Sequence, residues 1–156
     1  MNNLIILGAN YLHYVSIFIA ILFLVVSKEL QKKRVLILAI FALSIAFVTA
    51  RIAGFLFYNP RPFVMGKIQP LIPHAANNGF PSDHVLLTMT IATTIFVYNR
   101  KLGIFLSIIA LFVGVSRVLA RVHNQVDIFG AVIIAIASVW ISWCILKKVN
   151  FINHER

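Results

Sequence analysis

Three short polar runs stand in an otherwise apolar chain, and their residue types could together carry out phosphoryl chemistry. The runs are Asn59-Pro60-Arg61-Pro62, Pro81-Ser82-Asp83-His84, and Ser116-Arg117 followed by His123 and Asp127. Polar groups at the ends of apolar stretches are costly to desolvate, so we interpret these runs as functional. Their arginines, histidines, serine and aspartates predict a phosphate-binding site with a nucleophile and an acid.

His123 and Asp127 are spaced i, i+4, which places both side chains on one face of a helix. A carboxylate one turn from an imidazole fixes the tautomer of the ring and stabilises its cationic form. This arrangement primes the other ring nitrogen of His123 to act as a nucleophile or a base.

The other two runs supply groups that bind an anion. Pro81-Ser82-Asp83-His84 is typical of a helix start, with Ser82 or Asp83 as the N-cap. The first turn of a helix offers free N–H groups and the positive end of a dipole, which suits an anion. Arg61, held between two prolines, and Arg117 offer planar, always charged groups that hold phosphate oxygens.

Histidines and aspartates are also metal ligands, so a metal site is the rival interpretation. Beyond the single i, i+4 pair the chain shows no zinc-like spacing. The two arginines would repel a cation. We therefore expect neither a metal nor another cofactor.

Composition places these runs in a membrane protein. The chain has 156 residues, of which 61% are hydrophobic and 12% charged, and its mean hydropathy is +0.95. A soluble domain is about 45–50% apolar and about 25% charged. The net charge of +10 is not gathered into a basic arm or an aromatic-interleaved patch, so we expect no nucleic-acid partner.

Five apolar stretches could each form a membrane-spanning helix, which needs about 20 residues and tolerates fewer. The stretches are Tyr11–Val26, Val35–Phe57, His84–Tyr98, Leu102–Leu119 and Val126–Leu146. No repeat, low-complexity tract or linker divides residues 1–156. The prediction is an all-α, polytopic membrane bundle of about five transmembrane helices in a single domain.

Basic residues predict the orientation of the bundle. Nine of the 14 Lys and Arg residues flank the stretches on one side: Lys28, Lys32, Lys33, Arg34, Arg100, Lys101, Lys147, Lys148 and Arg156. We expect this side to be cytoplasmic, with the N-terminus outside. The loop 59–83 and all three polar runs would then lie on the extracytoplasmic side, among membrane lipids.

Four further residues on the same predicted side are candidates to bind substrate: Arg51, Lys67, His74 and Arg121. Each also has a plainer interpretation. Arg51 would equally snorkel or pair with an acid, Lys67 would be solvated, and His74 would only shape its loop. Arg121 would add a charge for a diphosphate or face lipid headgroups. His13 is interpreted as a polar handle at the membrane interface.

These residues resemble the three signature motifs of the type 2 phosphatidic acid phosphatase superfamily. The matching segments are Arg61-Pro62, Pro81-Ser82-Asp83-His84, and Ser116-Arg117 with His123 and Asp127. The loop segments Arg61-Pro62-Phe63 and Leu71-Ile72-Pro73-His74-Ala75-Ala76 look most like the bacterial undecaprenyl-diphosphatase branch. The motif region covers about residues 51–130, and the three-part pattern is far more specific than any one part.

The resemblance implies a role for each residue. His123 would attack phosphorus and form a phosphohistidine, and Asp127 would orient and stabilise His123. His84 would protonate the leaving oxygen and then activate water, without a metal. The phosphoryl oxygens would be bound at Arg61, Ser82, Asp83 and Arg117.

The chain departs from the superfamily pattern at three points. The first motif usually begins with a lysine seven residues before Arg61, where this chain has Gly54. Arg51, one turn earlier on the same face, could substitute for that lysine. The residue two before His123 is often glycine but is Arg121 here. Members commonly have six spans, whereas we predict five.

We therefore expect a membrane phosphatase that converts undecaprenyl diphosphate, a polyprenyl diphosphate, to undecaprenyl phosphate in a bacterial cytoplasmic membrane. One alternative is another lipid phosphate, such as phosphatidylglycerophosphate, phosphatidic acid or a lipid A phosphate. A second is a non-catalytic headgroup binder or a small transporter, which would place its ionisable residues nearer the bilayer midplane. The sequence makes no prediction of oligomeric state.

Overall fold

The computed structural model describes residues 2–66 and 68–149, and within these ranges its regular elements are six helices. They are α1 (Asn2–Val26), α2 (Glu29–Leu56), α3 (Pro62–Met65), α4 (Asp83–Tyr98), α5 (Arg100–Leu119) and α6 (Gln125–Lys148). The predicted all-α class is confirmed.

Four of the helices, α1, α2, α5 and α6, are long and apolar enough to cross a membrane. Helix α4 is also apolar but has only 16 residues. The expectation of about five transmembrane helices agrees with these five elements. The protein is a multi-pass membrane protein.

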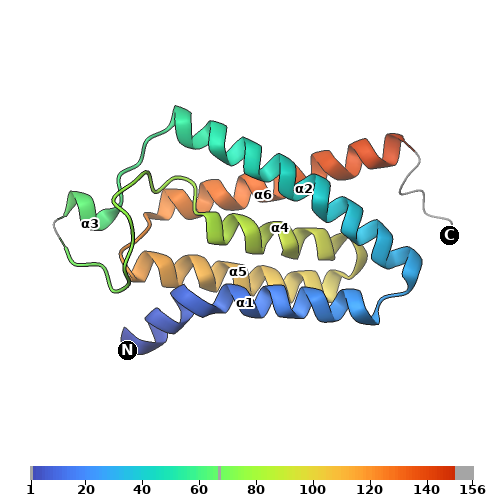
Figure 1. Ribbon diagram of the computed structural model, residues 1–156, viewed down its shortest axis with the longest axis horizontal. Helices are drawn as coiled ribbons and strands as arrows, with labels where there is room; N and C mark the ends of the chain where they lie inside the picture. The colour runs from blue at the N-terminus through green and yellow to red at the C-terminus, as the bar shows by residue number, and fades with distance from the viewer. Residues whose placement is uncertain (1, 67, 150–156) are drawn as a thin grey trace.

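The first apolar span is longer than predicted. Its expected start at Tyr11 is corrected, because α1 begins at Asn2. No proline lies between Asn2 and Asn10, and the helix continues through Gly8. Helix α1 therefore extends to the end of the bundle at which α2 ends and α4 begins (Figure 1).

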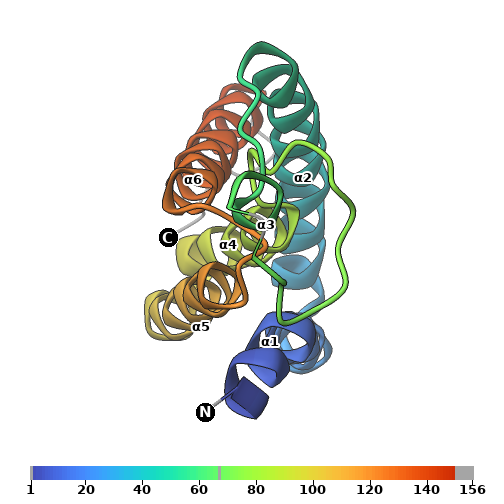
Figure 2. The same cartoon turned by 90° about the vertical axis from the view of Figure 1, so that its left-hand side faces the viewer.

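Helix α4 lies in the middle of the bundle, with α2 and α6 on one side and α1 and α5 on the other (Figure 2). Ala46 and Ala50 of α2 share a buried cluster with Ala131 and Ala135 of α6. Small side chains let apolar helices approach closely where lipid offers no hydrophobic contrast. The close approach holds the helix ends, and hence the polar runs, in fixed relative positions.

The polar runs meet at one end of the bundle, where α2 and α5 end and α4 and α6 begin (Figure 1). Helix α3 and the described parts of the connection between α2 and α4 lie across this end (Figure 2). Gly79 N donates to Asn59 O at 2.9 Å, and Asn78 Nδ2 donates to Gly54 O at 2.7 Å. These bonds tie the connection to the end of α2.

Candidate active site

His123 lies between Asp127 and Arg61, and these two neighbours fix its tautomer. Nδ1 is 3.2 Å from Asp127 Oδ2, and Nε2 is 3.2 Å from Arg61 Nη1. A guanidinium only donates and a carboxylate only accepts. Nδ1 therefore carries the proton, and Nε2 presents its lone pair on the side of the arginine, as a nucleophile requires.

Burial keeps this imidazole uncharged. The side chain of His123 is 3% exposed. Burial lowers the pKa of His123 below its ordinary value of 6.5, the hydrogen bond to Asp127 opposes this shift, and Arg117 and Arg61 reinforce it. The neutral, nucleophilic form therefore prevails at neutral pH.

Asp127 is fully buried in the first turn of α6 and is held by more than the histidine. Its Oδ2 also accepts from Asn124 N at 2.8 Å. Its Oδ1 accepts from Asn59 Nδ2 at 2.7 Å. A buried carboxylate is stable only when such bonds satisfy it, so these donors fix its orientation towards His123.

Arg61 is buried beside His123 and is held by the loop residues around it. Its Nε donates to Asn77 Oδ1 at 2.9 Å, and its Nη1 donates to Val122 O at 2.6 Å. Its Nη2 donates to Asn78 O at 3.3 Å. The guanidinium is therefore preorganised next to the lone pair of His123.

Arg117 reaches the site from the last turn of α5. Its Nη1 donates to Ala9 O of α1 at 3.0 Å, and its Nη2 lies 3.0 Å from His74 Nε2. Burial, together with the charges of Arg61 and Arg117, lowers the pKa of His74 to about 4. His74 is therefore neutral and accepts this bond. Among the described residues Arg117 Nε has no partner, which leaves a donor for a ligand.

Ser82 is the N-cap of α4, as predicted, but its side chain makes no capping hydrogen bond. Its backbone N donates to Asp127 O at 3.2 Å, which joins the start of α4 to the start of α6. The hydroxyl is buried and finds no partner in the described part of the chain. A buried hydroxyl left unpaired at such a place is available to bind a ligand oxygen.

His84 follows in the first turn of α4 and is half-buried. Its ring meets the ring of His13 in a T-shaped pair, with centroids 4.6 Å apart and planes at 88°. The interpretation of His13 as a polar handle at the membrane interface is therefore wrong. Only 8% of His13 is exposed, because its face of α1 turns inward towards α4.

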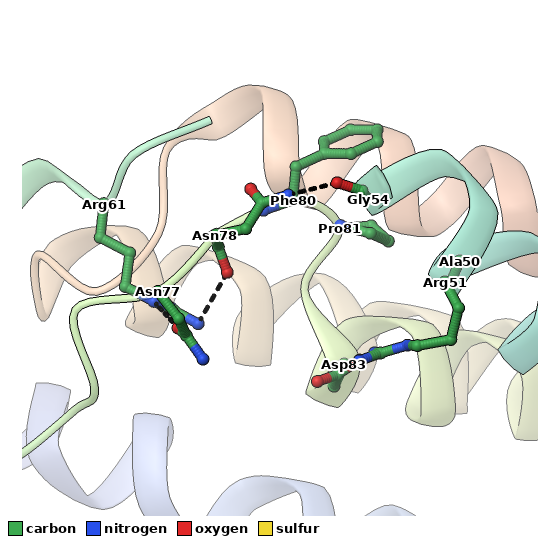
Figure 3. A pocket seen from close by; sticks show the side chains of 9 residues that line it. All are labelled: Ala50, Arg51, Gly54, Arg61, Asn77, Asn78, Phe80, Pro81 and Asp83. Carbon is green, nitrogen blue, oxygen red and sulfur yellow. Dashed lines mark hydrogen bonds and ion pairs between the residues drawn. The ribbon is translucent and has the colours of Figure 1, made fainter. Parts of the chain in front are cut away.

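Next to this cluster lies a pocket of about 250 Å³ between the end of α2, the start of α4 and the loop (Figure 3). Arg61 and Asn77 line it on the loop side. Arg51 and Asp83 point towards one another on the helix side and form an ion pair (Figure 3). Both partners are more than half exposed, so each can exchange the other for a ligand.

Gly54 lines the same pocket, at the position where the motif usually has lysine. A Cβ added there would lie 2.8 Å from Phe80 O. The close backbone approach leaves no room for a lysine at this position in this chain. Arg51, one turn earlier on α2, brings its positive charge to the pocket instead.

The predicted site residue Arg121 bonds to the loop and not to His123. Arg121 is exposed and donates from Nη1 to Gln69 O at 3.3 Å. Its φ of 64° lies in the left-handed region, which explains in physical terms why glycine is common at this position. Lys67 lies outside the described residues.

Sequence reasoning missed the polar residues that support the pair of His123 and Asp127. Asn59 stands within a polar run, and Asn77 and Asn78 stand in the loop, but none was given a role. An asparagine has no diagnostic spacing, and a loop asparagine is common in any turn. Of the described residues, no three His, Cys, Asp or Glu side chains gather into a group able to hold a metal ion.

Phosphoryl transfer from a lipid needs a nucleophile that stays neutral beside arginines, at a place that the lipid headgroup can reach. A neutral imidazole beside two arginines at one end of an apolar helical bundle is the arrangement expected of an integral membrane phosphatase. The PAP2 superfamily model matches residues 33–151. The chain is a member of the PAP2 superfamily.

Curated relatives agree with this membership. The chain is 28% identical over 156 residues to the bacitracin transport permease protein BcrC of Bacillus licheniformis, covering 98% of this chain and 75% of the relative. It is 41% identical over 80 residues to the undecaprenyl-diphosphatase BcrC of Bacillus subtilis, covering 51% of this chain and 42% of that one. It is 33% identical over 104 residues to the putative undecaprenyl-diphosphatase YbjG of Escherichia coli, covering 66% and 52%.

A solved structure shares the fold. The crystal structure of Aquifex aeolicus LpxE superposes with a TM-score of 0.70 at 25% identity, covering 90% of this chain and 81% of that one. With the family match and the phosphatases among the relatives, this likeness makes the protein a lipid phosphatase.

Proposed function

We propose that the protein hydrolyses undecaprenyl diphosphate to undecaprenyl phosphate through a phosphohistidine on His123. The observation that carries this proposal is the pair of contacts that places the proton of His123 on Nδ1 and its lone pair on Nε2. The relatives named as undecaprenyl-diphosphatases support the choice of lipid.

In the first step, His123 Nε2 attacks the terminal phosphorus. The P–N bond forms while the bond from phosphorus to the bridging oxygen breaks, and His84 gives its proton to that oxygen. Undecaprenyl phosphate leaves. The imidazolium that results keeps its Nδ1 proton directed at Asp127 Oδ2, so the buried carboxylate stabilises the new positive charge.

In the second step, the same residues hydrolyse the phosphohistidine. His84, now without its proton, takes one from a water molecule as the water oxygen attacks phosphorus. The P–N bond breaks, inorganic phosphate leaves, and Nε2 recovers its lone pair. This exchange returns both histidines to their starting protonation.

Charge on the phosphoryl oxygens is stabilised by groups that are already in place. Arg61 Nη1 lies beside the nucleophilic nitrogen. The partnerless Arg117 Nε and Ser82 Oγ provide further hydrogen bonds. The free N–H groups at the start of α4, in the turn of Asp83, add donors with the favourable sign of the helix dipole.

The neighbouring pocket suits the second phosphoryl group of a diphosphate. Arg51 lines it, and its ion pair with Asp83 is exchangeable because both side chains are exposed. Arg121 and, from the sequence alone, Lys67 are proposed as further positive charges for the substrate, and the neutral His74 as a hydrogen-bonding group. A monophosphate would leave this positive charge unused.

The proposed location is a bacterial cytoplasmic membrane, with the active site on the extracytoplasmic side. The nine basic residues that flank the other ends of the spans support this orientation. The relatives are bacterial proteins. The substrate would then keep its tail in the bilayer while its headgroup enters the site from the outer leaflet.

Transport is the second candidate, because one relative carries the name of a transport permease. A transporter is expected to hold its polar residues near the bilayer midplane. Here His74, His123, Arg61, Arg117 and Asp127 gather at one end of the bundle, where α4 and α6 begin. That placement favours hydrolysis at a membrane face.

The test is phosphate release by the purified protein in detergent, with undecaprenyl diphosphate, farnesyl diphosphate, phosphatidylglycerophosphate, phosphatidic acid and lipid A as substrates. We expect the highest kcat/KM for the two diphosphates. His123→Asn should abolish release while thermal unfolding stays unchanged. A preference for phosphatidylglycerophosphate, or near-normal release by His123→Asn, would refute the proposed substrate or the proposed nucleophile respectively.

A further inference from the structure

Helix α1 lies outside the region that the superfamily model matches, which is residues 33–151, yet it touches the catalytic residues at two points. Ala9 O accepts from Arg117 Nη1 at 3.0 Å. His13, four residues further along the same face, packs its ring on His84. Helix α1 thus contacts both Arg117, which is proposed to bind the substrate, and His84, the proposed acid.

The approach of α1 is tight enough to be specific. A Cβ added at Gly8 would lie 2.3 Å from Ser116 Oγ and 3.0 Å from Ser116 Cβ, so a larger residue at position 8 would force the Ser116 side chain to move. That approach sets the depth at which Ala9 and His13 enter the site. A helix that merely filled space would not need it.

His13 is an unusual choice for a packing residue. It is 8% exposed, and its Nδ1 finds no hydrogen-bond partner in the part of the chain that the structure describes. A buried polar atom without a partner costs about 1–3 kcal/mol. An aromatic residue without nitrogen would pack there without that cost, so the fold alone does not account for a histidine.

His13 also fixes one side of the His84 ring. The two rings are perpendicular, at 88°, with centroids 4.6 Å apart. The ring of Tyr14 lies on His13 in turn, with centroids 4.0 Å apart, and 59% of Tyr14 is exposed. No hydrogen bond from the side chain of His84 to a described residue holds its ring, so the contact with His13 limits how far that ring can rotate.

We propose that His13 is a positioning residue for the acid His84, and that α1 thereby completes the active site. This inference rests on the proposed function of His84 as the group that protonates the leaving oxygen. An acid that rotates away cannot deliver its proton as the P–O bond breaks. The loss on removing His13 should therefore depend on how much the leaving group needs a proton.

The experiment compares two substrates of one purified protein. Farnesyl phosphate releases an alkoxide and needs the proton, whereas 4-nitrophenyl phosphate releases a stable phenolate and does not. We expect His13→Ala to lower kcat for farnesyl phosphate by roughly 10- to 100-fold, within the range of general acid catalysis, and to lower kcat for 4-nitrophenyl phosphate by at most about threefold. Equal losses on both substrates, or no loss, would overturn the proposal.

A conservative variant and a double mutant separate positioning from folding. His13→Phe keeps the ring contact and removes the unpartnered nitrogen, so it should unfold at or above the wild-type temperature and keep kcat for farnesyl phosphate within about threefold. A folded His13→Phe as impaired as His13→Ala would contradict positioning by the ring. In a His84→Ala background, His13→Ala should cause no further loss, and a further tenfold loss would also contradict it.

Phe18→Ala is the matched control, because Phe18 lies on the same helix and is 61% exposed. It should behave as wild type on both substrates. Absence of phosphate release from undecaprenyl diphosphate by the wild-type protein would refute the proposed function itself, and it is thereby distinguished from a failure of the His13 proposal.

Discussion

Asn59 donates from Nδ2 to Oδ1 of Asp127 at 2.7 Å, which joins the segment after α2 directly to the carboxylate behind His123. The two residues are 68 positions apart in the chain. The other oxygen of Asp127 serves His123 and Asn124. The orientation of the catalytic pair therefore depends on how the segment before α3 packs against α6.

Asn59→Ala should lower kcat by roughly 10- to 100-fold, because losing a hydrogen bond to a buried charge costs about 1.5–3 kcal/mol. KM should change little, since Asn59 contacts Asp127 rather than the pocket that binds substrate. Phosphate release against substrate concentration measures both constants. Asn3→Ala, an exposed change in α1, is the control. An unchanged kcat would show that Asp127 is held without Asn59.

In a plot of kcat/KM against pH, the midpoint of the acid limb should lie below pH 6.5. Protonation of His123 removes the lone pair that attacks phosphorus, and the pKa of His123 is lowered from 6.5 by burial, Arg117 and Arg61. The neutral form therefore persists to a lower pH than in a free histidine. Rates measured from pH 4 to pH 8 would locate the limb, and a midpoint above that of a free histidine, about 6.5, would contradict the assignment.

Arg61→Gln should shift that limb to higher pH, since removing a neighbouring positive charge raises the pKa of His123. The rate itself should fall, so the comparison uses the normalised pH profile. Lys148→Gln removes the same charge at the far end of α6 and should leave the limb in place.

Arg51→Gln should erode the preference for diphosphates. Arg51 lines the pocket proposed for the second phosphoryl group, and losing one charged contact there should reduce kcat/KM for farnesyl diphosphate by about tenfold. The value for farnesyl phosphate should stay within about twofold. Lys101→Gln, at the opposite end of the bundle, controls for the change in net charge. An equal decrease in kcat/KM for both substrates would show that Arg51 does not bind the second phosphoryl group.

Arg121→Gly and Arg121→Val should differ in stability rather than in mechanism. The φ of 64° at Arg121 is accessible to glycine and costs about 1–2 kcal/mol for residues with a Cβ, most for β-branched ones. Thermal unfolding in detergent should show Arg121→Gly at or above wild type and Arg121→Val clearly lower. Arg100→Val, within helix α5, controls for loss of the arginine. Equal unfolding temperatures for the two variants at position 121 would contradict the backbone argument.

The sequence was sufficient to predict the helical bundle and the gathering of its polar runs at one end, for one physical reason. Charged and hydroxyl side chains at the ends of apolar spans are too costly to be incidental, so Arg61, Arg117, His123 and Asp127 could be singled out. The structure brings these four to one end of the bundle. Their catalytic roles stay predictions.

The supporting residues could not be found in that way. Asn59 reaches Asp127 only because the segment after α2 folds back onto α6. His13 reaches His84 because α1 packs closely on α5, with Gly8 against Ser116. Such contacts depend on the three-dimensional approach of segments far apart in the chain. Neither asparagine nor histidine stands here in a spacing pattern that would predict its contact.

The shortness of α4 has a consequence for where the reaction takes place. Sixteen residues at about 1.5 Å each give about 24 Å, less than the hydrocarbon thickness of about 30 Å. With the orientation proposed above, we expect the turn that carries Ser82 and His84 to lie below the level of the glycerol groups, in a recess of the outer leaflet. A lipid phosphate sinks to reach it and does not need to lift its chain from the bilayer. Turnover should accordingly vary with membrane thickness, as the recess deepens or closes.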